Sequence, residues 1–161
     1  YYDGNRVTFY EMGCRLGGSY FNHEQACLGY NAMDMIIRFA LTGQMVEDIN
    51  EISKESAKYK KYALDCNYLL KGVNETVVSI VGMEKIEAMP ECIEIQKYQG
   101  IGYHYGKDRT VDRPIMVAEV VADNKEEVKR IVNYINSEFD VFNERGESLL
   151  MEKLDPEVLF Q

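Results

Sequence analysis

Long apolar runs and paired cysteines are missing from this sequence. No run approaches the roughly 20 apolar residues that a helix needs to cross a bilayer. The four cysteines, Cys14, Cys27, Cys66 and Cys92, show no CxxC spacing. This pattern is typical of reduced thiols in a cytosolic protein rather than of a disulfide framework or a zinc site. We therefore predict a globular cytoplasmic protein with no membrane partner.

Positive charge is scarce as well. The chain has 18 Lys and Arg residues against 27 Asp and Glu residues, which gives a formal net charge of -9. Nucleic-acid affinity is built from clustered Lys and Arg, so this balance argues against nucleic acid as a partner. The basic stretch from Lys54 to Lys61 also contains Glu55 and follows Glu51. We interpret it as the solvated face of a linker.

The sequence also lacks an initial methionine. It begins at Tyr1, directly before the turn-forming residues Asp3, Gly4 and Asn5. A strand-like alternation from Val7 to Met12 follows, so the pattern predicts a hairpin whose first strand is cut short. We therefore expect the chain to be a piece of a larger protein. Its 161 residues, of which 46% are hydrophobic, suffice for one ordinary domain.

The clearest local signal is a helix that begins after Asn31. Asn31 is a suitable N-cap, Asp34 lies at the capping-box position, and Gly43 is a suitable helix end. Its apolar residues recur at helical spacing and form one stripe, which we expect to be buried core. The stripe comprises Met33, Ile36, Ile37, Ala40 and Leu41.

The second half of the chain alternates short β-rich runs with one strong helix. Strands are expected within residues 62–70, 76–81, 91–98 and 114–121, and a final strand or pair of strands within 140–151. The helix is expected after an Asp123 cap, with Glu126 at the box position and an apolar face formed by Val128, Ile131, Val132, Ile135 and Phe139. Regular βαβ alternation is absent, which predicts an α+β fold with a largely antiparallel sheet.

Four segments follow from this organisation. Residues 1–43 form the first unit, residues 44–61 a helical linker, and residues 62–154 a C-terminal α+β lobe. Residues 155–161 end in EVLFQ, which resembles the remnant of a cleavable tag, with a native helix end as the alternative.

The strand before the first helix carries an acid where an apolar residue is expected. Glu11 shares a strand face with Val7 and Phe9. An isolated carboxylate is costly to bury, so Glu11 must meet a cation, meet hydrogen-bond donors, or lie where the strand runs out into solvent.

The segment FYEMGCRLGG, residues 9–18, resembles the late signature of ATP-grasp enzymes, in which a strand delivers Glu before Arg and a glycine-rich loop. The helix YNAMDMIIRFALTG and the small lobe after it are similar to the ends of chains related to the carbamoyl-phosphate synthase large subunit and biotin carboxylase. The likeness covers residues 1–43 well and the rest in outline. It implies the end of an ATP-grasp module, comprising hairpin, glycine loop and helix, followed by the lobe.

The resemblance also implies an activity and a set of site residues. Such enzymes activate a carboxylate as an acylphosphate with ATP and Mg²⁺, and an amine or similar nucleophile then attacks it. Glu11 would be the magnesium ligand and Arg15 the catalytic cation, with its planar donors on a phosphoryl group or carboxylate. Gly17 and Gly18 would let backbone N–H groups approach the nucleotide. Alternatively, Arg15 forms a surface salt bridge and the glycines form an ordinary turn.

One position departs from the family pattern. Gly13 stands where the family usually has an Asn that binds a second metal ion, so that ligand position is in doubt. The upstream nucleotide-binding parts are not in this chain, so we expect the fragment alone to be inactive. The expected partners are ATP and a small carboxylate, and a homodimer is the assembly considered. The alternative function is a non-catalytic oligomerisation or substrate-docking lobe beside a degenerate ATP site.

Both histidines and one glycine-rich stretch have weaker patterns. His23 at the start of a helix could touch substrate, but a capping or core role is favoured, and His104 is equally ambiguous. The stretch GIGYHYG, residues 100–106, does not match a dinucleotide-binding loop, because its third glycine is one position late. We expect it to be a flexible loop near the active face.

Overall fold

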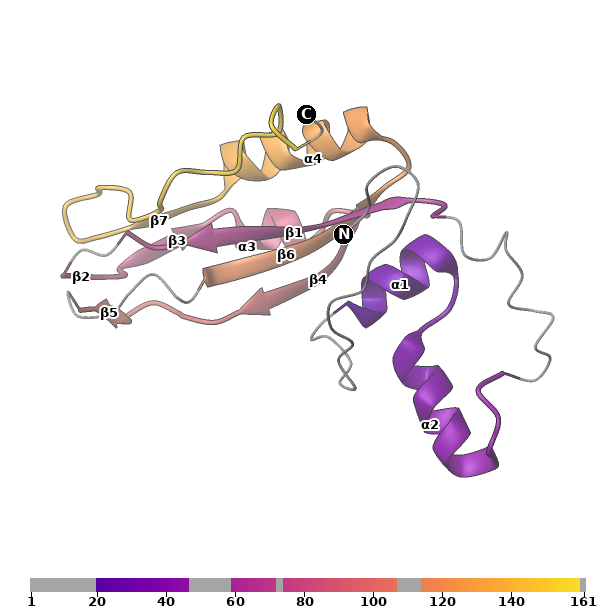
Figure 1. Cartoon of the computed structure of the whole chain (residues 1–161). Coiled ribbons are helices and arrows are strands. Elements are labelled where there is room, and N and C mark those ends of the chain that lie inside the picture. The colour runs from indigo at the N-terminus through magenta and orange to yellow at the C-terminus, as the bar shows by residue number, and fades with distance from the viewer. Residues whose placement is uncertain (1–19, 47–58, 72–73, 107–113, 160–161) are drawn as a thin grey trace, which may run out of the picture.

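A three-stranded antiparallel sheet forms the centre of the fold. The computed structural model describes residues 20–46, 59–71, 74–106 and 114–159 (Figure 1). The strands lie in the order β1 (Tyr62–Leu69), β6 (Pro114–Ala122) and β4 (Cys92–Lys97), and β6 is antiparallel to both neighbours. The predicted α+β class with a largely antiparallel sheet is confirmed.

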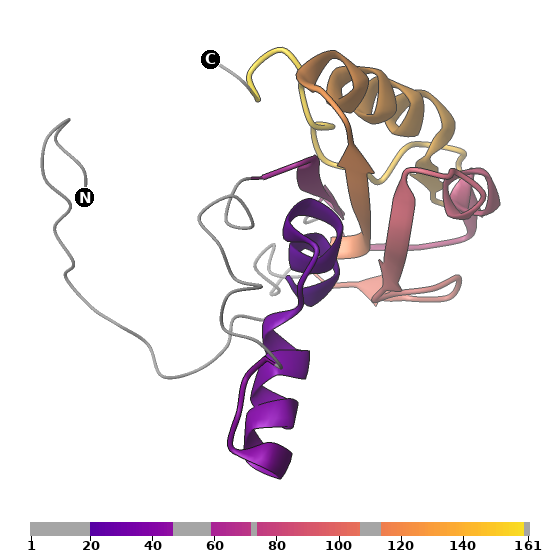
Figure 2. The ribbon, with the colours of Figure 1, turned by 90° about the vertical axis from the view of Figure 1, so that its right-hand side faces the viewer.

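Helix α4 (Lys125–Glu138) covers one face of this sheet (Figures 1 and 2). The apolar face predicted for it is confirmed, since Val128, Ile131, Val132, Ile135 and the C-cap Phe139 are all buried. The ring of Phe139 meets that of Tyr68 on β1 edge-on, with centroids 5.1 Å apart. The main core therefore lies between α4 and the sheet.

The start of α4 differs from the prediction by one residue. The N-cap is Asn124 rather than Asp123, and its side-chain oxygen accepts a hydrogen bond from the backbone N–H of Glu127 at 2.9 Å. Glu127, not Glu126, bonds back, accepting from the N–H of Asp123 at 2.8 Å. Asp and Asn are equally good N-caps, so the sequence alone does not decide which of these two adjacent residues begins the helix.

Shorter strands form two separate two-stranded sheets. β2 (Glu75–Thr76) pairs with β5 (His104–Tyr105), and β3 (Ser79–Val81) pairs with β7 (Asp140–Phe142), beside the short helix α3 (Met83–Glu87). The single strand expected within 76–81 is therefore divided between two pairings. The GIGYHYG stretch was expected to be a loop throughout, but its His104 and Tyr105 form β5, with Tyr105 buried.

Two helices lie on the other side of the molecule (Figure 2). They are α1 (Phe21–Leu28) and α2 (Ala32–Thr42). The predicted caps of α2 are confirmed, because the Asn31 side chain accepts from the N–H groups of Met33 and Asp34 and Gly43 adopts a left-handed φ of 75°.

The predicted burial of the α2 apolar stripe is wrong in this structure. No residue of α2 is buried, and Ile36, Ile37, Ala40 and Leu41 are exposed. Periodicity identified the apolar face correctly but could not show what packs against it.

The segments predicted at 44–61 and 155–161 are described only in part. Residues 44–46 and 59–61 are not helical, and the rest of the predicted helical linker lies outside the described residues. Within the last segment, Leu159 packs against the core and Glu157 forms an ion pair with Lys129 at 2.6 Å. Within the described ranges, no helix has the length and apolar character needed to span a bilayer.

Candidate functional site

The residues predicted from the ATP-grasp resemblance lie outside the described part of the chain. This applies to Glu11, Gly13, Arg15, Gly17 and Gly18. Their roles therefore stay predictions. The described residues begin at Tyr20, two positions after Gly18 in the sequence.

Helix α1 covers part of the sheet face opposite α4. Its contacts are with β1 and β6, and its two buried side chains are His23 and Cys27. The helix ends at Gly29, which has a φ of 83° and whose N–H donates to the carbonyl of Gln25. The carboxylate of Glu24 accepts from the N–H of Ala32 at 3.0 Å, so it links α1 to the start of α2.

A row of carboxylates crosses the sheet on the face covered by α1. Along β6, Ala118 and Val120 belong to the core cluster beneath α4, so the intervening Glu119 points to the opposite face. In the antiparallel register Glu119 lies opposite Asp65 of β1 and is also paired with Glu94 of β4. Three acids therefore stand side by side across three neighbouring strands.

His23 of α1 lies over this row. Its Nε2 is 3.3 Å from Oδ1 of Asp65 and 3.7 Å from Oε2 of Glu119. His23 is 9% exposed and Glu119 is 0% exposed. The adjacent Asn22 donates from Nδ2 to Oε2 of Glu94 at 2.5 Å. Two successive residues of α1 thus contact all three carboxylates.

A second set of hydrogen bonds fixes the Glu119 side chain. Nε2 of Gln96 donates to Oε1 of Glu119 at 2.6 Å, and the hydroxyl of Tyr98 donates to Oε1 of Gln96 at 2.6 Å. Burial raises the pKa of Glu119, and the neighbouring acids Glu94 and Asp65 raise it further, while His23 and the Gln96 hydrogen bond oppose the rise. The cluster can therefore hold a positive charge or a proton between His23 and the carboxylates.

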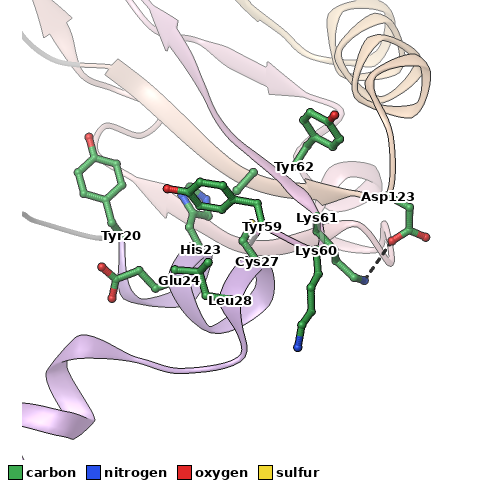
Figure 3. A pocket seen from close by; sticks show the side chains of 11 residues that line it. Tyr20, His23, Glu24, Cys27, Leu28, Tyr59, Lys60, Lys61, Tyr62 and Asp123 are labelled. Atoms are coloured by element: carbon green, nitrogen blue, oxygen red, sulfur yellow. Dashed lines mark ion pairs between the residues drawn. The ribbon is translucent and has the colours of Figure 1, made fainter. Parts of the chain in front are cut away.

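A cavity of about 820 Å³ opens beside His23 (Figure 3). One wall comes from Tyr20 and α1, and the other from residues 59–63 and Asp123. The backbone N–H of Lys60 donates to the carbonyl of Cys27 at 2.8 Å, which joins the two walls. The Lys61 ammonium lies 3.5 Å from the Asp123 carboxylate.

The lining of this cavity combines aromatic rings with charged groups of both signs. Tyr20, Tyr59 and Tyr62 supply rings and hydroxyls, while Lys60 and Lys61 supply ammonium groups. Such a lining suits a small molecule with an apolar body and an anionic group.

Sequence reasoning did not find the His23 cluster as a unit. The core role favoured for His23 agrees with its burial, but Asp65 and Glu119 were not singled out. A signal was present, because Glu119 is an acid within the apolar run PIMVAEVVA of β6. His23 and Glu119 are 96 positions apart in the sequence, so their contact could not be inferred without the strand register.

The other candidates, His104 and the cysteines, have contacts typical of structural residues. Nδ1 of His104 and the Thr76 hydroxyl form a hydrogen bond of 3.0 Å, and Nε2 of His104 is 3.2 Å from Oδ1 of Asn74. This arrangement joins β5 to β2. Cys27, Cys66 and Cys92 are free thiols, and Cys14 lies outside the described residues.

Comparisons with known proteins give a likeness of fold. No protein-family model and no curated protein sequence matches the chain. Among solved structures, L-amino acid ligase from Bacillus licheniformis matches with a TM-score of 0.64 and 19% sequence identity. The match covers 82% of this chain and 31% of that enzyme, so the chain corresponds to about a third of the ligase. The described fold is therefore similar to one part of an L-amino acid ligase.

Proposed function

We propose that this chain is the C-terminal part of an ATP-grasp ligase that joins a carboxylate to an amine. The observation that carries the proposal is the fold likeness to an L-amino acid ligase, which extends over 82% of the chain. The order of Glu11, Arg15 and the paired Gly17 and Gly18 in the sequence also supports it, because this order resembles the late signature of ATP-grasp enzymes.

The predicted residues have distinct roles in this proposal. Bound ATP with Mg²⁺ would supply the phosphoryl group that activates the carboxylate. The carboxylate of Glu11 is a hard oxygen donor of the kind that holds Mg²⁺. The guanidinium of Arg15 would orient an anionic group through paired N–H donors. Gly17 and Gly18 would leave backbone N–H groups open to an anion.

The described cavity fits the binding of a small substrate. It begins at Tyr20, two residues after Gly18, and offers the ammonium groups of Lys60 and Lys61 beside aromatic rings. A carboxylate with an apolar body, such as an amino acid, has the complementary chemistry. We propose cytoplasmic location and, as an assembly to be tested, a homodimer.

The test uses the longer protein that contains this chain. Pairs of L-amino acids with ATP and Mg²⁺ are expected to release phosphate only when both a carboxylate and an amine are present. Glu11→Gln keeps the size of the side chain but removes its charge, so turnover should fall by orders of magnitude while the thermal midpoint changes little. Arg15→Lys should also be costly, because it keeps the charge but loses the planar fork.

Matched variants separate catalysis from stability. Glu152→Gln and Arg130→Lys change exposed side chains of the lobe and should leave turnover unchanged. If the Glu11 and Arg15 variants kept their turnover while their thermal midpoints dropped, the two residues would be a structural ion pair. The glycine at position 13 adds a further test, since Gly13→Asn should tighten the magnesium dependence of turnover if it restores a metal ligand.

One observation favours the alternative of a non-catalytic docking lobe. The apolar side chains of α2 are exposed, with Leu41 at 80%. Absence of amine-dependent phosphate release from the longer protein, together with concentration-dependent self-association that Leu41→Asp abolishes, would support that alternative over the ligase.

A further inference from the structure

The carboxylate row beneath α1 carries more negative charge than the positive groups in contact with it can balance. Asp65 and Glu119 lie directly opposite each other in the strand register, and Glu94 pairs with Glu119 from the other strand. Like charges directly opposite on one face destabilise a sheet. Among the described residues, the group in ionic contact with both Asp65 and Glu119 is His23. One imidazole, even when protonated, cannot balance three carboxylates.

The donor atoms converge at distances that suit metal coordination. Nε2 of His23, Oδ1 of Asp65 and Oε2 of Glu119 all lie within 4.8 Å of one another. The two separations from Nε2 are 3.3 Å and 3.7 Å. Tetrahedral coordination with metal–ligand bonds of about 2.0–2.2 Å places ligand atoms roughly 3.3–3.6 Å apart. The two separations from Nε2 are therefore close to those between ligands around one ion.

These atoms are also buried without hydrogen bonds. In the described part of the chain, Nε2 of His23, Oδ1 of Asp65 and Oε2 of Glu119 have no hydrogen-bond partner. Buried polar atoms are normally hydrogen-bonded, so three orphaned atoms that face one another indicate a ligand between them. The fully buried carboxylate of Glu119 is already aimed, because Gln96 holds its other oxygen at 2.6 Å. Hydrogen bonds of this kind orient the ligands of metal sites.

We propose that His23, Asp65 and Glu119 bind one divalent transition-metal ion, with Zn²⁺ as the reference ion. An imidazole and two carboxylates are suitable ligands for Zn²⁺, and also for Mn²⁺, whereas Mg²⁺ favours oxygen ligands and retains its water. The charge of the ion offsets the two facing carboxylates. The proposed ligands include none of the residues predicted from the ATP-grasp resemblance, and the proposal does not rest on the proposed ligase function.

The ion would fix α1 to the sheet. His23 comes from α1, Asp65 from β1 and Glu119 from β6, so one ion joins three elements that are far apart in the sequence. Cys27 lies one turn further along the same helix and is buried, which makes its thiol a reporter of α1 docking. Metal binding should therefore protect Cys27 from alkylation.

The first measurement is metal content. The chain, stripped with a chelator, is dialysed against Zn²⁺, Mn²⁺ or Mg²⁺ and analysed for bound metal. We expect one Zn²⁺ per chain, no retained Mg²⁺, and an X-ray absorption spectrum with nitrogen and oxygen ligands near 2.0–2.1 Å. We also expect Zn²⁺ to slow the alkylation of Cys27 and to raise the thermal midpoint.

Variants locate the ion. His23→Gln, Asp65→Asn and Glu119→Gln should each weaken Zn²⁺ binding by at least about 100-fold, and Gln96→Leu by about 10- to 100-fold through loss of ligand orientation. Glu119→Gln and Asp65→Asn preserve shape, and circular dichroism verifies their folding. His104→Gln is the matched histidine control and should bind Zn²⁺ like the unchanged chain.

Three results would overturn the proposal. They are failure to retain Zn²⁺ or Mn²⁺, unchanged affinity in folded His23, Asp65 and Glu119 variants, or sulfur in the coordination shell. Any of them would assign His23 to a bridge between carboxylates rather than to a metal site.

Discussion

Helices α2 and α4 have the same capping and apolar pattern but differ in how far that apolar face is buried. Each begins at an Asn whose side-chain oxygen caps the backbone, and each has an apolar stripe at helical spacing. In α4 the stripe is buried against the sheet, with Ile135 at 0% exposure, whereas in α2 the corresponding Ile37 is 51% exposed. Periodicity therefore identifies the apolar face of a helix but not the element that covers it.

The difference has an energetic consequence. Burial of apolar surface stabilises by roughly 25 cal/mol per Å², so α4 is held by the core. Helix α2 has 11 residues, and isolated helices shorter than about 12–15 residues are marginal in water. Within the described residues, its caps and local hydrogen bonds therefore contribute more to its stability, relative to burial, than those of α4 do.

The largest contrast is expected at two glycines with left-handed φ. A Cβ on Gly82 would lie 2.1 Å from the carbonyl oxygen of Glu138 at the end of α4, whereas one on Gly43 would meet nothing within 4 Å. Gly82→Ala should cost roughly 3–5 kcal/mol from strain and overpacking, and Gly43→Ala only about 1–2 kcal/mol of local strain. Urea unfolding measures both. Equal losses would mean that the Glu138 backbone moves aside easily.

The second contrast concerns the two isoleucines. Ile135→Ala should lower the free energy of unfolding by roughly 2–5 kcal/mol, because it leaves a cavity between α4 and the sheet. Ile37→Ala should change it by less than about 0.5 kcal/mol, since the side chain is half exposed in this chain. A large, concentration-dependent loss for Ile37→Ala would show instead that the α2 face packs against a second copy.

Sequence patterns predicted the elements better than their partners. The β1 and β6 strands, the α4 stripe and the caps of α2 followed from local periodicity and capping chemistry. The exposure of the α2 apolar face did not follow from these patterns, because what packs against a helix is decided by the tertiary fold. The cluster of His23, Asp65 and Glu119 depends on strand register across a long separation in sequence, which a single sequence does not encode locally.

A third and smaller contrast separates the two caps. Asn124→Ala should cost roughly 0.5–2 kcal/mol of global stability, because its helix is part of the core. Asn31→Ala should instead reduce the helicity of residues 32–42 and leave the global unfolding midpoint unchanged. Amide hydrogen exchange and urea unfolding distinguish the two responses. Asn133→Ala, at an exposed position of α4, is the control. A fall in the global midpoint for Asn31→Ala would show that α2 unfolds together with the core.

The smallest effect is expected at an ion pair that fastens α4. Nη2 of Arg130 lies 2.5 Å from Oε1 of Glu91. The hydrogen bond from Arg130 is the main cause that lowers the pKa of Glu91 below its ordinary 4.5. A lowered pKa in the folded state stabilises the protein above pH 4.5, and this contribution is lost as the pH falls through the lowered value.

Glu91→Gln should therefore lower the urea midpoint slightly at pH 7, and the difference from the unchanged chain should shrink as the pH falls below 4.5 through the lowered pKa of Glu91. High salt should reduce it as well, because the Arg130 guanidinium is exposed to solvent. Glu152→Gln, at an exposed position, serves as the control. A difference that did not shrink as the pH fell below 4.5 would have to come from packing or hydrogen bonding at residue 91 rather than from the charge of its carboxylate.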